Sequence, residues 1–579
     1  MIKKVEVEHF KRFQKEEFLL EDAVVLAGPN NSGKTTLIQA IVTWSTTLER
    51  WRMGKGQSRL GREGGGRSTP ALRAGQPVTR KDFVALPLRE FGLLWNQTKT
   101  GLTRAERKPD QKPGEPRLIQ LTVHGTQGLT EESPWQLTME LRYQSPEQIY
   151  AKPVGLENGR IPDQAERLLV VHCPPFSGIG AEEKRMDRGA QQLEIGRGKP
   201  GDVLRNLLLE VSEGEDQWES LVESVQELFR VTLIKPDYNP TLPFILCEYR
   251  AGVDVHRGGV RYDIASGGSG FHQVLLLLSL LHARPASVLL LDEPDAHLHV
   301  ILQRQIHQRL RDIAIRRSCQ LIIATHSEVL LDATSPSKIV SFLGKPHRLV
   351  GDSERDRVRE AMARLTTLDL LLAERDRAIL YCEGQSDFAI LEAWADALDH
   401  PAKRFFASPF FHSNVGRNPR EARGHLFALK AVVPDIRGLL ILDGDNRKLP
   451  DHDIASEGLS IARWRRYEIE NYLIVPAAIE RLLTSDPPDH FSNSQAKAAI
   501  DYLKTQFPPA FLQDPLSDEY EIALEVPASK RILPQMFKAA GRMMEKSDFF
   551  HVARVMKPSE IHPDVKAMLD LVATLATSE

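Results

Sequence analysis

The chain has 579 residues, of which 41% are hydrophobic and 26% are charged, and its formal net charge is −3. This length predicts two or three domains, and the composition is ordinary for a soluble globular protein. The near-neutral charge excludes a globally basic nucleic-acid-binding protein, so contacts to nucleic acid would have to come from local patches.

The apolar segments and the cysteines indicate the compartment. No apolar run approaches the ~20 residues that a membrane helix needs, so no membrane contact is expected. The start of the chain, MIKKVEVEHF, alternates and carries charge, which predicts a strand rather than a signal peptide. The cysteines lie far apart and form no metal-binding pair, which fits reduced thiols in the cytoplasm. They are Cys173, Cys247, Cys319 and Cys382.

The N-terminal segment predicts a strand that leads into a phosphate-binding loop. Residues 5–7 and 18–20 predict two strands around a turn near Phe13, and residues 23–27 predict a buried strand. The next residues, 28–35, read GPNNSGKT, and a helix is predicted directly after them. A glycine-rich loop in this setting closes its backbone N–H groups around phosphate oxygens, and the positive helix N-terminus adds to the attraction.

Each polar residue of this loop has an expected role. Lys34 should reach the β- and γ-phosphates of ATP, and Thr35 should ligate Mg²⁺. The expected nucleotide-binding residues are Asn30, Asn31, Ser32, Gly33, Lys34, Thr35 and Thr36.

The following region alternates between polar segments and core elements. Residues 52–67 are glycine-rich and basic, so we expect a mobile loop that could contact nucleic acid, although a merely solvated loop is favoured. Residues 99–117 should also be exposed. Paired strands are predicted at 118–123 and 136–143, a strand at 167–173, and inserted helices within 202–229.

A second glycine-rich segment precedes an apolar helix predicted at residues 274–283. Residues 265–273 read ASGGSGFHQ, and small residues at a helix N-terminus leave N–H groups free for a phosphate. Ser266 and Gly268 resemble the signature of ABC-type ATPases, with Ala265 in place of the usual leucine. In that arrangement the signature faces the γ-phosphate held by another subunit.

The next segment, SVLLLDEPDAH at residues 287–297, is an uncharged strand that ends in two acids. Open α/β sheets place their ligands at the carboxyl ends of strands. Asp292 can therefore hold Mg²⁺, while Glu293 polarises the water that attacks the phosphate.

A further buried strand at residues 320–324 delivers His326, which resembles the switch histidine that contacts the γ-phosphate. Asp295 and His297 resemble the loop that lies at the seam between two ATPase subunits. The order of phosphate loop, signature, paired acids and histidine is the order of an ABC-type ATPase.

Residues 1–372 resemble an ABC-type ATPase head, most similar to those of the overcoming-lysogenisation-defect (OLD) nucleases and their relatives in the Gabija and PARIS bacterial defence systems. The resemblance implies an α/β P-loop fold with insertions at about 45–117 and 180–235. A glutamine loop is not evident, and Gln97 and Gln111 are only candidates. A zinc-hook coiled coil is absent from the sequence, which argues against a chromosome-structure ATPase.

The second half repeats the theme of strands that end in acids. Residues 378–382 predict a strand followed by Glu383, and Ser386 is expected to cap a helix with Asp387 in its first turn. Residues 438–442 predict another strand, which ends in Asp-Gly-Asp.

This pattern resembles the Toprim nuclease domain. Carboxylates at the ends of neighbouring parallel strands can bind one or two divalent ions that assist phosphodiester cleavage. The expected Mg²⁺ or Mn²⁺ ligands are Glu383, Asp387, Asp443 and Asp445, of which Glu383, Asp443 and Asp445 would be catalytic. The alternative is a degenerate Toprim fold kept for partner binding.

Two basic patches flank these acids. Residues 463–466, RWRR, could hold a phosphate backbone and stack a base, but a solvated charge run is equally compatible. The EIENY segment that follows resembles part of the nuclease component of PARIS, so Glu468 or Glu470 is a further candidate metal ligand. The second patch contains Arg417, Arg420, Arg423 and His425, and Lys530 is a candidate catalytic cation in the helical tail.

The sequence thus predicts an ABC-type head (1–372), a Toprim-like Rossmannoid domain (373–475) and a helical region (476–579). The predicted function is an antiphage ATPase–nuclease that uses ATP, Mg²⁺ and a second Mg²⁺ or Mn²⁺ site. Its expected partners are DNA or tRNA, a second copy bound through the heads, and a defence subunit. The alternatives are an ATPase scaffold that sequesters a toxic effector, with an inert Toprim fold, and a DNA-repair ATPase governed by DNA ends.

Overall fold

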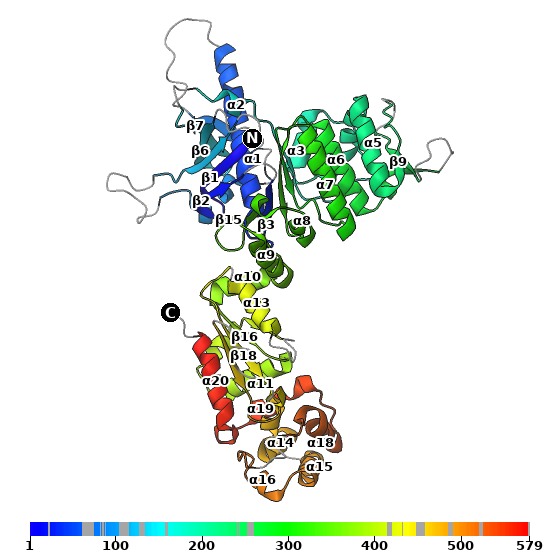
Figure 1. Cartoon of the computed structure of the whole chain (residues 1–579). Coiled ribbons are helices and arrows are strands. Elements are labelled where there is room, and N and C mark those ends of the chain that lie inside the picture. The colour runs from blue at the N-terminus through cyan, green and yellow to red at the C-terminus, as the bar shows by residue number, and fades with distance from the viewer. Residues whose placement is uncertain are drawn as a thin grey trace. The chain divides into compact units, whose positions relative to one another are not determined.

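The computed structural model describes most of the chain and divides it into two compact units, Met1–Met362 and Ala363–Glu579 (Figure 1). The described residues are 1–20, 24–60, 75–80, 83, 86, 88–102, 115–126, 134–156, 160–239, 241, 244–251, 260–413, 420–430, 432–446, 458–484, 490–519 and 525–576. None of the helices within these ranges combines the length and apolar character that a transmembrane segment requires.

The first unit begins with an antiparallel sheet in the order β2-β1-β5-β6-β7-β4. Buried and partly exposed residues alternate along β5, so one face of the sheet packs against the core. The expected pair of strands around Phe13 and the paired strands after residue 118 are confirmed. The bounds are β1 Ile2–Phe10, β2 Phe13–Leu19, β4 Gln76–Thr79, β5 Ile119–Gly125, β6 Trp135–Ser145 and β7 Gln148–Val154.

A second sheet, in the order β15-β14-β3-β13-β12-β8, carries the phosphate loop. Its central strands β3, β13, β12 and β8 are mutually parallel, and the residues of β3, β12 and β13 are buried throughout, as expected for a sheet covered on both faces. All four strands predicted for this region are confirmed. The bounds are β3 Val24–Ala27, β8 Val170–Cys173, β12 Val288–Asp292, β13 Gln320–Thr325, β14 Ile339–Ser341 and β15 His347–Arg348.

Helices cover both faces of this second sheet. Helix α1 (Lys34–Leu60) packs between the two sheets, whereas α6 (Ser269–Ala283) and α7 (Val300–Arg316) pack on the opposite face. Helix α1 overturns the expectation of a loop from residue 52, because the helix continues to Leu60; residues 61–67 lie outside the described residues.

The remaining elements of the first unit are mostly short. They are η1 Phe91–Leu94, η2 Asn96–Thr98, α2 Asp163–Glu166, α3 Arg188–Gly196, η4 Pro200–Val203, α4 Leu204–Ser212, α5 Glu215–Phe229, β9 Val231–Leu233, β10 Glu248–Ala251, β11 Arg261–Asp263, η5 Ile264–Ser266, α8 Glu328–Asp332, η6 Pro336–Lys338 and α9 Asp352–Arg364. Helices α4 and α5 fall where inserted helices were predicted.

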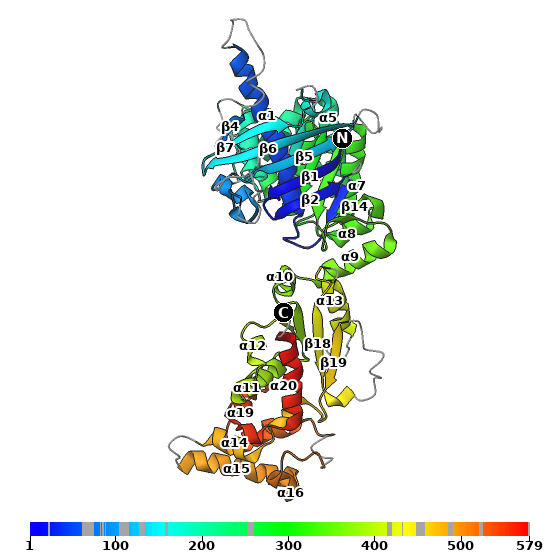
Figure 2. The ribbon, with the colours of Figure 1, turned by 90° about the vertical axis from the view of Figure 1, so that its left-hand side faces the viewer.

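The second unit is built on a parallel sheet in the order β17-β16-β18-β19. Helix α20 lies along this sheet beside α12 (Figure 2). The strands are β16 Ala378–Tyr381, β17 Phe411–His412, β18 Arg437–Leu442 and β19 Leu459–Arg463. The longer helices are α10 Thr367–Asp376, α11 Gln385–Ala397, α13 Arg420–Lys430, α14 Pro476–Leu483, α15 His490–Gln506, α18 Leu533–Ala539 and α20 Pro563–Ala576. The shorter helices are α12 Lys403–Phe406, η7 Gly444–Asn446, η9 Ile469–Leu473, α16 Pro509–Gln513, η10 Ala528–Ile532, η11 Lys546–Asp548, α19 Phe550–Val555 and η12 Pro558–Glu560.

The C-terminal helices do not form a separate region. Leu439 and Ile441 of the sheet share one hydrophobic core with Leu533 and Leu569 of the tail. The boundary between the two units lies after Met362 rather than after residue 372, because α10 packs against β16 and α13 of the second unit.

The expected nucleic-acid patch at residues 463–466 is largely structural. Trp464 is buried and packs edge-on against Trp394, so it cannot stack a base. The Arg466 side chain is 2% exposed, pairs with Asp518 at 3.3 Å and donates a hydrogen bond to the Pro515 carbonyl at 2.9 Å. The side chain of Arg465 is 73% exposed, and its Nε lies 3.7 Å from the Asp564 carboxylate.

Arg466→Ala should therefore lower the free energy of unfolding by about 3 kcal/mol, because it leaves the partly buried Asp518 carboxylate and three carbonyls without the buried cation that they contact. Arg465→Ala is the matched control and should change the same quantity by less than about 0.5 kcal/mol. Urea unfolding followed by circular dichroism measures both. Equal stability of the two variants would contradict the structural role of Arg466.

Candidate functional site

The phosphate loop joins β3 to α1, and its lysine side chain donates hydrogen bonds to backbone carbonyls of the same loop. Gly33 has a φ of +112°, and a Cβ there would lie 2.9 Å from the Phe13 ring, so this position requires glycine. The Lys34 ammonium donates to the carbonyls of Gly28 at 2.6 Å and Pro29 at 2.8 Å. Burial lowers the pKa of Lys34 to about 8, although nearby acids oppose the shift. A phosphate would replace these carbonyls as the partner of the ammonium.

A residue that the sequence interpretation missed also contacts this loop. The Arg12 guanidinium, at the turn between β1 and β2, donates to the carbonyl of Asn31. Its place in a polar turn far from the loop motif carries no local signal, so only the pairing of β1 with β2 reveals the contact.

Asp292 ends β12 next to the loop. Its carboxylate accepts a hydrogen bond from the Thr35 hydroxyl at 3.1 Å. Burial raises the pKa of Asp292 to about 6, with Glu293 contributing in the same direction. A desolvated carboxylate bonded to a loop hydroxyl suits a divalent cation, and the two oxygens are of the kind that Mg²⁺ prefers. Thr35 and Asp292, the two expected Mg²⁺ ligands of this unit, therefore lie side by side.

Glu293 and His326 face each other beside the loop. His326 Nδ1 lies 3.5 Å from Glu293 Oε1. This contact lowers the pKa of Glu293 and raises that of His326, so the pair is an ionised carboxylate beside a more basic imidazole. Glu293 is the acid that lines a pocket of ≈ 220 Å³ together with residues 30–36 of the loop. The carboxylate that is expected to polarise water thus shares a pocket with the phosphate loop.

The signature segment lies outside this pocket. Ser266 and Gly268 are not among the residues that line it, and the Ser266 hydroxyl donates to the Asp263 carbonyl at 2.6 Å. A Cβ at Gly268 would meet no atom within 4 Å. The space beside Gly268 is therefore open.

Gln273 of the signature helix α6 links the signature to the acids. Its amide donates to the carbonyls of Pro294 at 2.8 Å and Glu293 at 3.2 Å. Asp295 accepts a hydrogen bond from Thr325 at 2.7 Å, which fixes the loop that leads to His297. Sequence inspection did not single out Gln273, although it lies within the signature segment.

The two candidates for a glutamine loop, Gln97 and Gln111, are not among the described residues that line the pocket. Gln97 is exposed and accepts a hydrogen bond from Lys99, and Gln111 lies outside the described residues.

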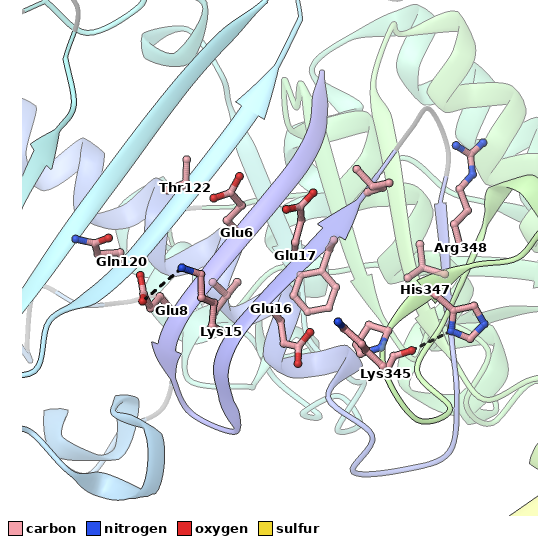
Figure 3. Close-up of a pocket in the computed structure, with 15 residues that line it drawn as sticks. Glu6, Glu8, Lys15, Glu16, Glu17, Gln120, Thr122, Lys345, His347 and Arg348 are labelled. Carbon is pink, nitrogen blue, oxygen red and sulfur yellow. Dashed lines mark hydrogen bonds and ion pairs between the residues drawn. The ribbon is translucent and has the colours of Figure 1, made fainter. Parts of the chain in front are cut away.

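A wider hollow of ≈ 530 Å³ lies elsewhere on the unit, between the outer face of β1, β2 and β5 and the β15 segment (Figure 3). Charges on its wall pair among themselves, as in Lys15 with Glu8 at 3.9 Å. No residue of the phosphate loop lines this hollow, so the smaller pocket is the candidate ATP site.

In the second unit, adjacent parallel strands bring the predicted acids to one edge. Glu383 follows β16 and accepts a hydrogen bond from the Asp443 backbone N–H, which follows β18, at 3.4 Å. Asp387 accepts from the Gly384 N–H at 3.1 Å, so Gly384 precedes the helix as its cap and the expectation for Ser386 is wrong. The Ser386 hydroxyl donates to Asp387 instead, at 3.0 Å.

These acids are withheld from water. Burial, followed by the charges of Glu383 and Asp387, raises the pKa of Asp443 to about 9. Burial raises the pKa of Glu470 to about 7 against the effect of Lys546. The Lys546 ammonium lies 2.9 Å from Glu470 Oε1 and 3.8 Å from Asp387 Oδ1. Glu470, which was only one of two candidates, therefore faces the acid cluster.

The acid cluster offers the oxygen ligands that a hard cation such as Mg²⁺ prefers, but its side chains are not close enough together to coordinate one. The second carboxylate oxygen of Glu470 is buried and has no hydrogen-bond partner. Among the described residues, however, no three acidic, histidine or cysteine side chains stand close enough to hold a metal as they are placed. Burial raises the pKa of Glu383, and the charge of Asp445 acts in the same direction, so Asp445 lies in the same neighbourhood. A cation would have to draw these side chains together.

The other candidates from the sequence are placed elsewhere. Glu468 is buried and accepts a hydrogen bond from the Ser529 backbone. His425 is buried and bonds to the Tyr381 hydroxyl at 3.0 Å, so it is a core residue rather than part of a basic patch. Lys530 is exposed, and Lys546 is the lysine that pairs with the acids. Arg417 lies outside the described residues, and Arg420 and Arg423 lie on α13.

Comparison with known proteins supports the assignment of the first unit. Residues 203–332 match the model of the family described as "AAA domain, putative AbiEii toxin, Type IV TA system". This segment contains Ser266, Asp292 and His326. This segment of the first unit is therefore similar to an ATPase domain of this family.

Solved structures that are similar to the chain include three SMC heads. The SMC head domain from Thermotoga maritima is 14% identical, with a TM-score of 0.30, and the match covers 59% of this chain and 94% of that one. The Smc head bound to the C-winged helix domain of ScpA is 16% identical, with a TM-score of 0.33 and coverages of 59% and 93%. The Smc head with an extended coiled coil bound to the C-terminal domain of ScpA, from Pyrococcus furiosus, is 14% identical, with a TM-score of 0.33 and coverages of 59% and 92%. A search of curated proteins finds no match.

Glu293→Gln should retain ATP binding and slow hydrolysis by roughly 10²–10⁴-fold, the usual contribution of a general base. Lys34→Ala should instead abolish tight ATP binding, because no other ammonium lies in the loop. Fluorescent-nucleotide titration and phosphate release measure the two effects separately. Normal turnover by Glu293→Gln would refute the role of this carboxylate.

The raised pKa of Asp443 predicts that the affinity of the second unit for a divalent metal depends on pH. A carboxyl group whose pKa is about 9 in the fold is neutral at pH 7, so it loses its proton when a cation binds. Apparent Mn²⁺ affinity should rise with pH, by up to about tenfold per unit below pH 9.

The same shift makes Asp443 destabilising in the absence of metal, since the unfolded carboxylate ionises freely above its ordinary pKa and the folded one does not. Asp443→Asn should thus raise the melting temperature at pH 8 in chelator and remove the gain that Mn²⁺ gives the wild type. A lower melting temperature in chelator for this variant would contradict the account.

Proposed function

We propose that the protein binds and hydrolyses ATP and that its second unit is a Toprim-type, metal-dependent nuclease under the control of the ATPase. The observation that carries the nuclease assignment is the placement of Glu383 and Asp443 at the carboxyl ends of two paired parallel strands, with Asp387 and Glu470 close enough to shift the pKa of Asp443. Crowded, desolvated carboxylates are costly, and a divalent cation relieves that cost.

The residues of the first unit divide the ATPase reaction between them. Lys34 would exchange its loop carbonyls for β- and γ-phosphate oxygens, and Thr35 and Asp292 would hold Mg²⁺. Glu293 is ionised and beside the loop, so it can orient the attacking water. His326, positioned 3.5 Å from Glu293, can place its imidazole against the γ-phosphate once the pair separates.

The residues of the second unit supply binding and charge. Bound Mg²⁺ or Mn²⁺ would neutralise charge that develops on a phosphodiester during cleavage. Glu383, Asp387, Asp443 and Asp445 are the acids that would hold it, and Glu470 adds an oxygen on the same side. Lys546 balances the buried acids before the metal arrives and can then turn toward a phosphate oxygen.

Partners follow from the surfaces. The exposed signature supports a homo-oligomer in which one head completes the ATP site of another. The guanidinium of Arg465 is exposed even though it lies 3.7 Å from Asp564, and its positive charge supports contact with a phosphate of DNA or tRNA. The resemblance to the OLD, Gabija and PARIS proteins and the toxin–antitoxin system in the description of the matched family support a cytoplasmic role in bacterial antiphage defence, with a possible second defence subunit.

One observation favours the second candidate function, an ATPase scaffold whose Toprim fold is inert and which holds a toxic effector. The Lys546 ammonium already lies against Glu470 and Asp387, so these two acids have a positive partner without a metal. The two functions differ in whether nucleic acid is cleaved.

Incubation of the protein with plasmid DNA and with total tRNA, in Mg²⁺ or Mn²⁺, tests this choice. The wild type should cleave one of them and stop in chelator, whereas Asp443→Ala should lose cleavage and keep ATP hydrolysis. Asp570→Ala, whose side chain is exposed on α20, is the control and should retain both activities. Identical behaviour of wild type and Asp443→Ala on both substrates would replace the nuclease by the scaffold.

A further inference from the structure

Helix α7 carries exposed apolar residues that the ATPase chemistry does not use. Ile301 and Ile315, near its two ends, are 66% and 70% exposed. They are two heptads apart, which brings them to nearly the same side of an α-helix. Gln308 lies midway between them on this side and is also exposed. The apolar ends and the polar centre therefore form one outward stripe.

The other sides of α7 are occupied. Ile306, Leu310 and Ile313 are buried in the core beneath the helix, which lies in the outer helical layer beside α6 (Figure 1). On one flank Arg309 pairs with Glu227 of α5. On the other flank Arg311 lies against β3 and β13. The outward stripe is thus the one side of α7 that no described element covers.

The stripe also carries opposite charges at equal distances from its centre. Arg304 lies one turn before Gln308 and forms no ion pair with any residue that the structure describes. Asp312 lies one turn after Gln308, and its carboxylate accepts a hydrogen bond from the Gln308 amide at 2.9 Å. The stripe reads isoleucine, arginine, glutamine, aspartate, isoleucine.

This order is complementary to its own reverse. Consider two antiparallel copies of the helix related by a two-fold axis through Gln308. A residue that lies a given number of positions before Gln308 then meets the residue that lies the same number of positions after Gln308 in the other copy. Ile301 then meets the second copy's Ile315, and Arg304 meets the second copy's Asp312. Both contacts occur twice, and two Gln308 amides meet at the axis. A parallel arrangement would place Arg304 against Arg304.

We propose that α7 is a self-association surface, on which a second copy of this chain docks antiparallel about Gln308. The occupant is a second copy, because the apolar and charged positions of the stripe match those of the same stripe in reverse. The contact is independent of nucleotide, since none of its residues lines the phosphate-loop pocket. None of its residues belongs to the signature segment, residues 265–273.

A cysteine at the centre of the stripe gives the most specific test. The four native cysteines are buried, so Gln308→Cys supplies an accessible thiol. Mild oxidation without nucleotide should join two chains through this position, because the two-fold axis brings the thiols together. Gln14→Cys, exposed on β2, is the matched control and should remain unlinked. Equal cross-linking of the two variants, or none in either, would overturn the proposal.

Light scattering of the nucleotide-free protein provides the second test. The wild type should have the mass of a dimer, and Ile301→Glu with Ile315→Glu should reduce it to a monomer of unchanged circular dichroism. Met543→Glu, an exposed apolar residue of the second unit, should leave the dimer intact. Arg304→Asp alone should weaken the dimer, and adding Asp312→Arg should restore it. A monomeric wild type, or a dimer that ignores the isoleucine changes, would refute the α7 contact. Neither result bears on ATP hydrolysis or nuclease activity.

Discussion

Carboxylates held out of water at the carboxyl ends of parallel strands are the constraint on which both units depend. Asp292 at the end of β12 and Asp443 after β18 have pKa values raised to about 6 and about 9 by burial. Such groups weaken the fold unless a cation or a proton accompanies them. Each unit surrounds its acids with the partners they need: Thr35 and Lys34 in the first, and Lys546 in the second.

Strand register converts this constraint into geometry. Asp292 is level with Ala324 of β13, so His326, just beyond the end of β13, arrives beside Glu293. In the second unit Tyr381 is level with Leu440, which places Glu383 next to Asp443 across the same edge. The spacing along the chain matters less than the number of residues by which each acid follows its strand.

Much of this could be read from the sequence, because the signals are local. The apolar strands, the phosphate loop and the paired acids can each be recognised from a segment of about ten residues. Arg466 shows the limit: its neighbours in the sequence suggest an exposed basic run, but its partner Asp518 comes from a distant segment.

Lys546 and Arg12 were missed for the same reason, since each acts on a motif to which it is not adjacent in sequence. The prediction for the end of α1 was wrong for a different reason. Glycine-rich composition predicted a loop from residue 52, but burial of Trp51 anchors the helix through that point. Tertiary packing overrode local propensity there.

The central claim is that the ATP state of the first unit governs cleavage by the second. The most direct measurement is the rate of nucleic-acid cleavage by the Glu293→Gln protein, which should hold ATP without hydrolysing it, compared in ATP, in ADP and without nucleotide. The account predicts that the rate in ATP differs at least severalfold from the other two. Equal rates in all three states would show that the two units work independently and would contradict the account.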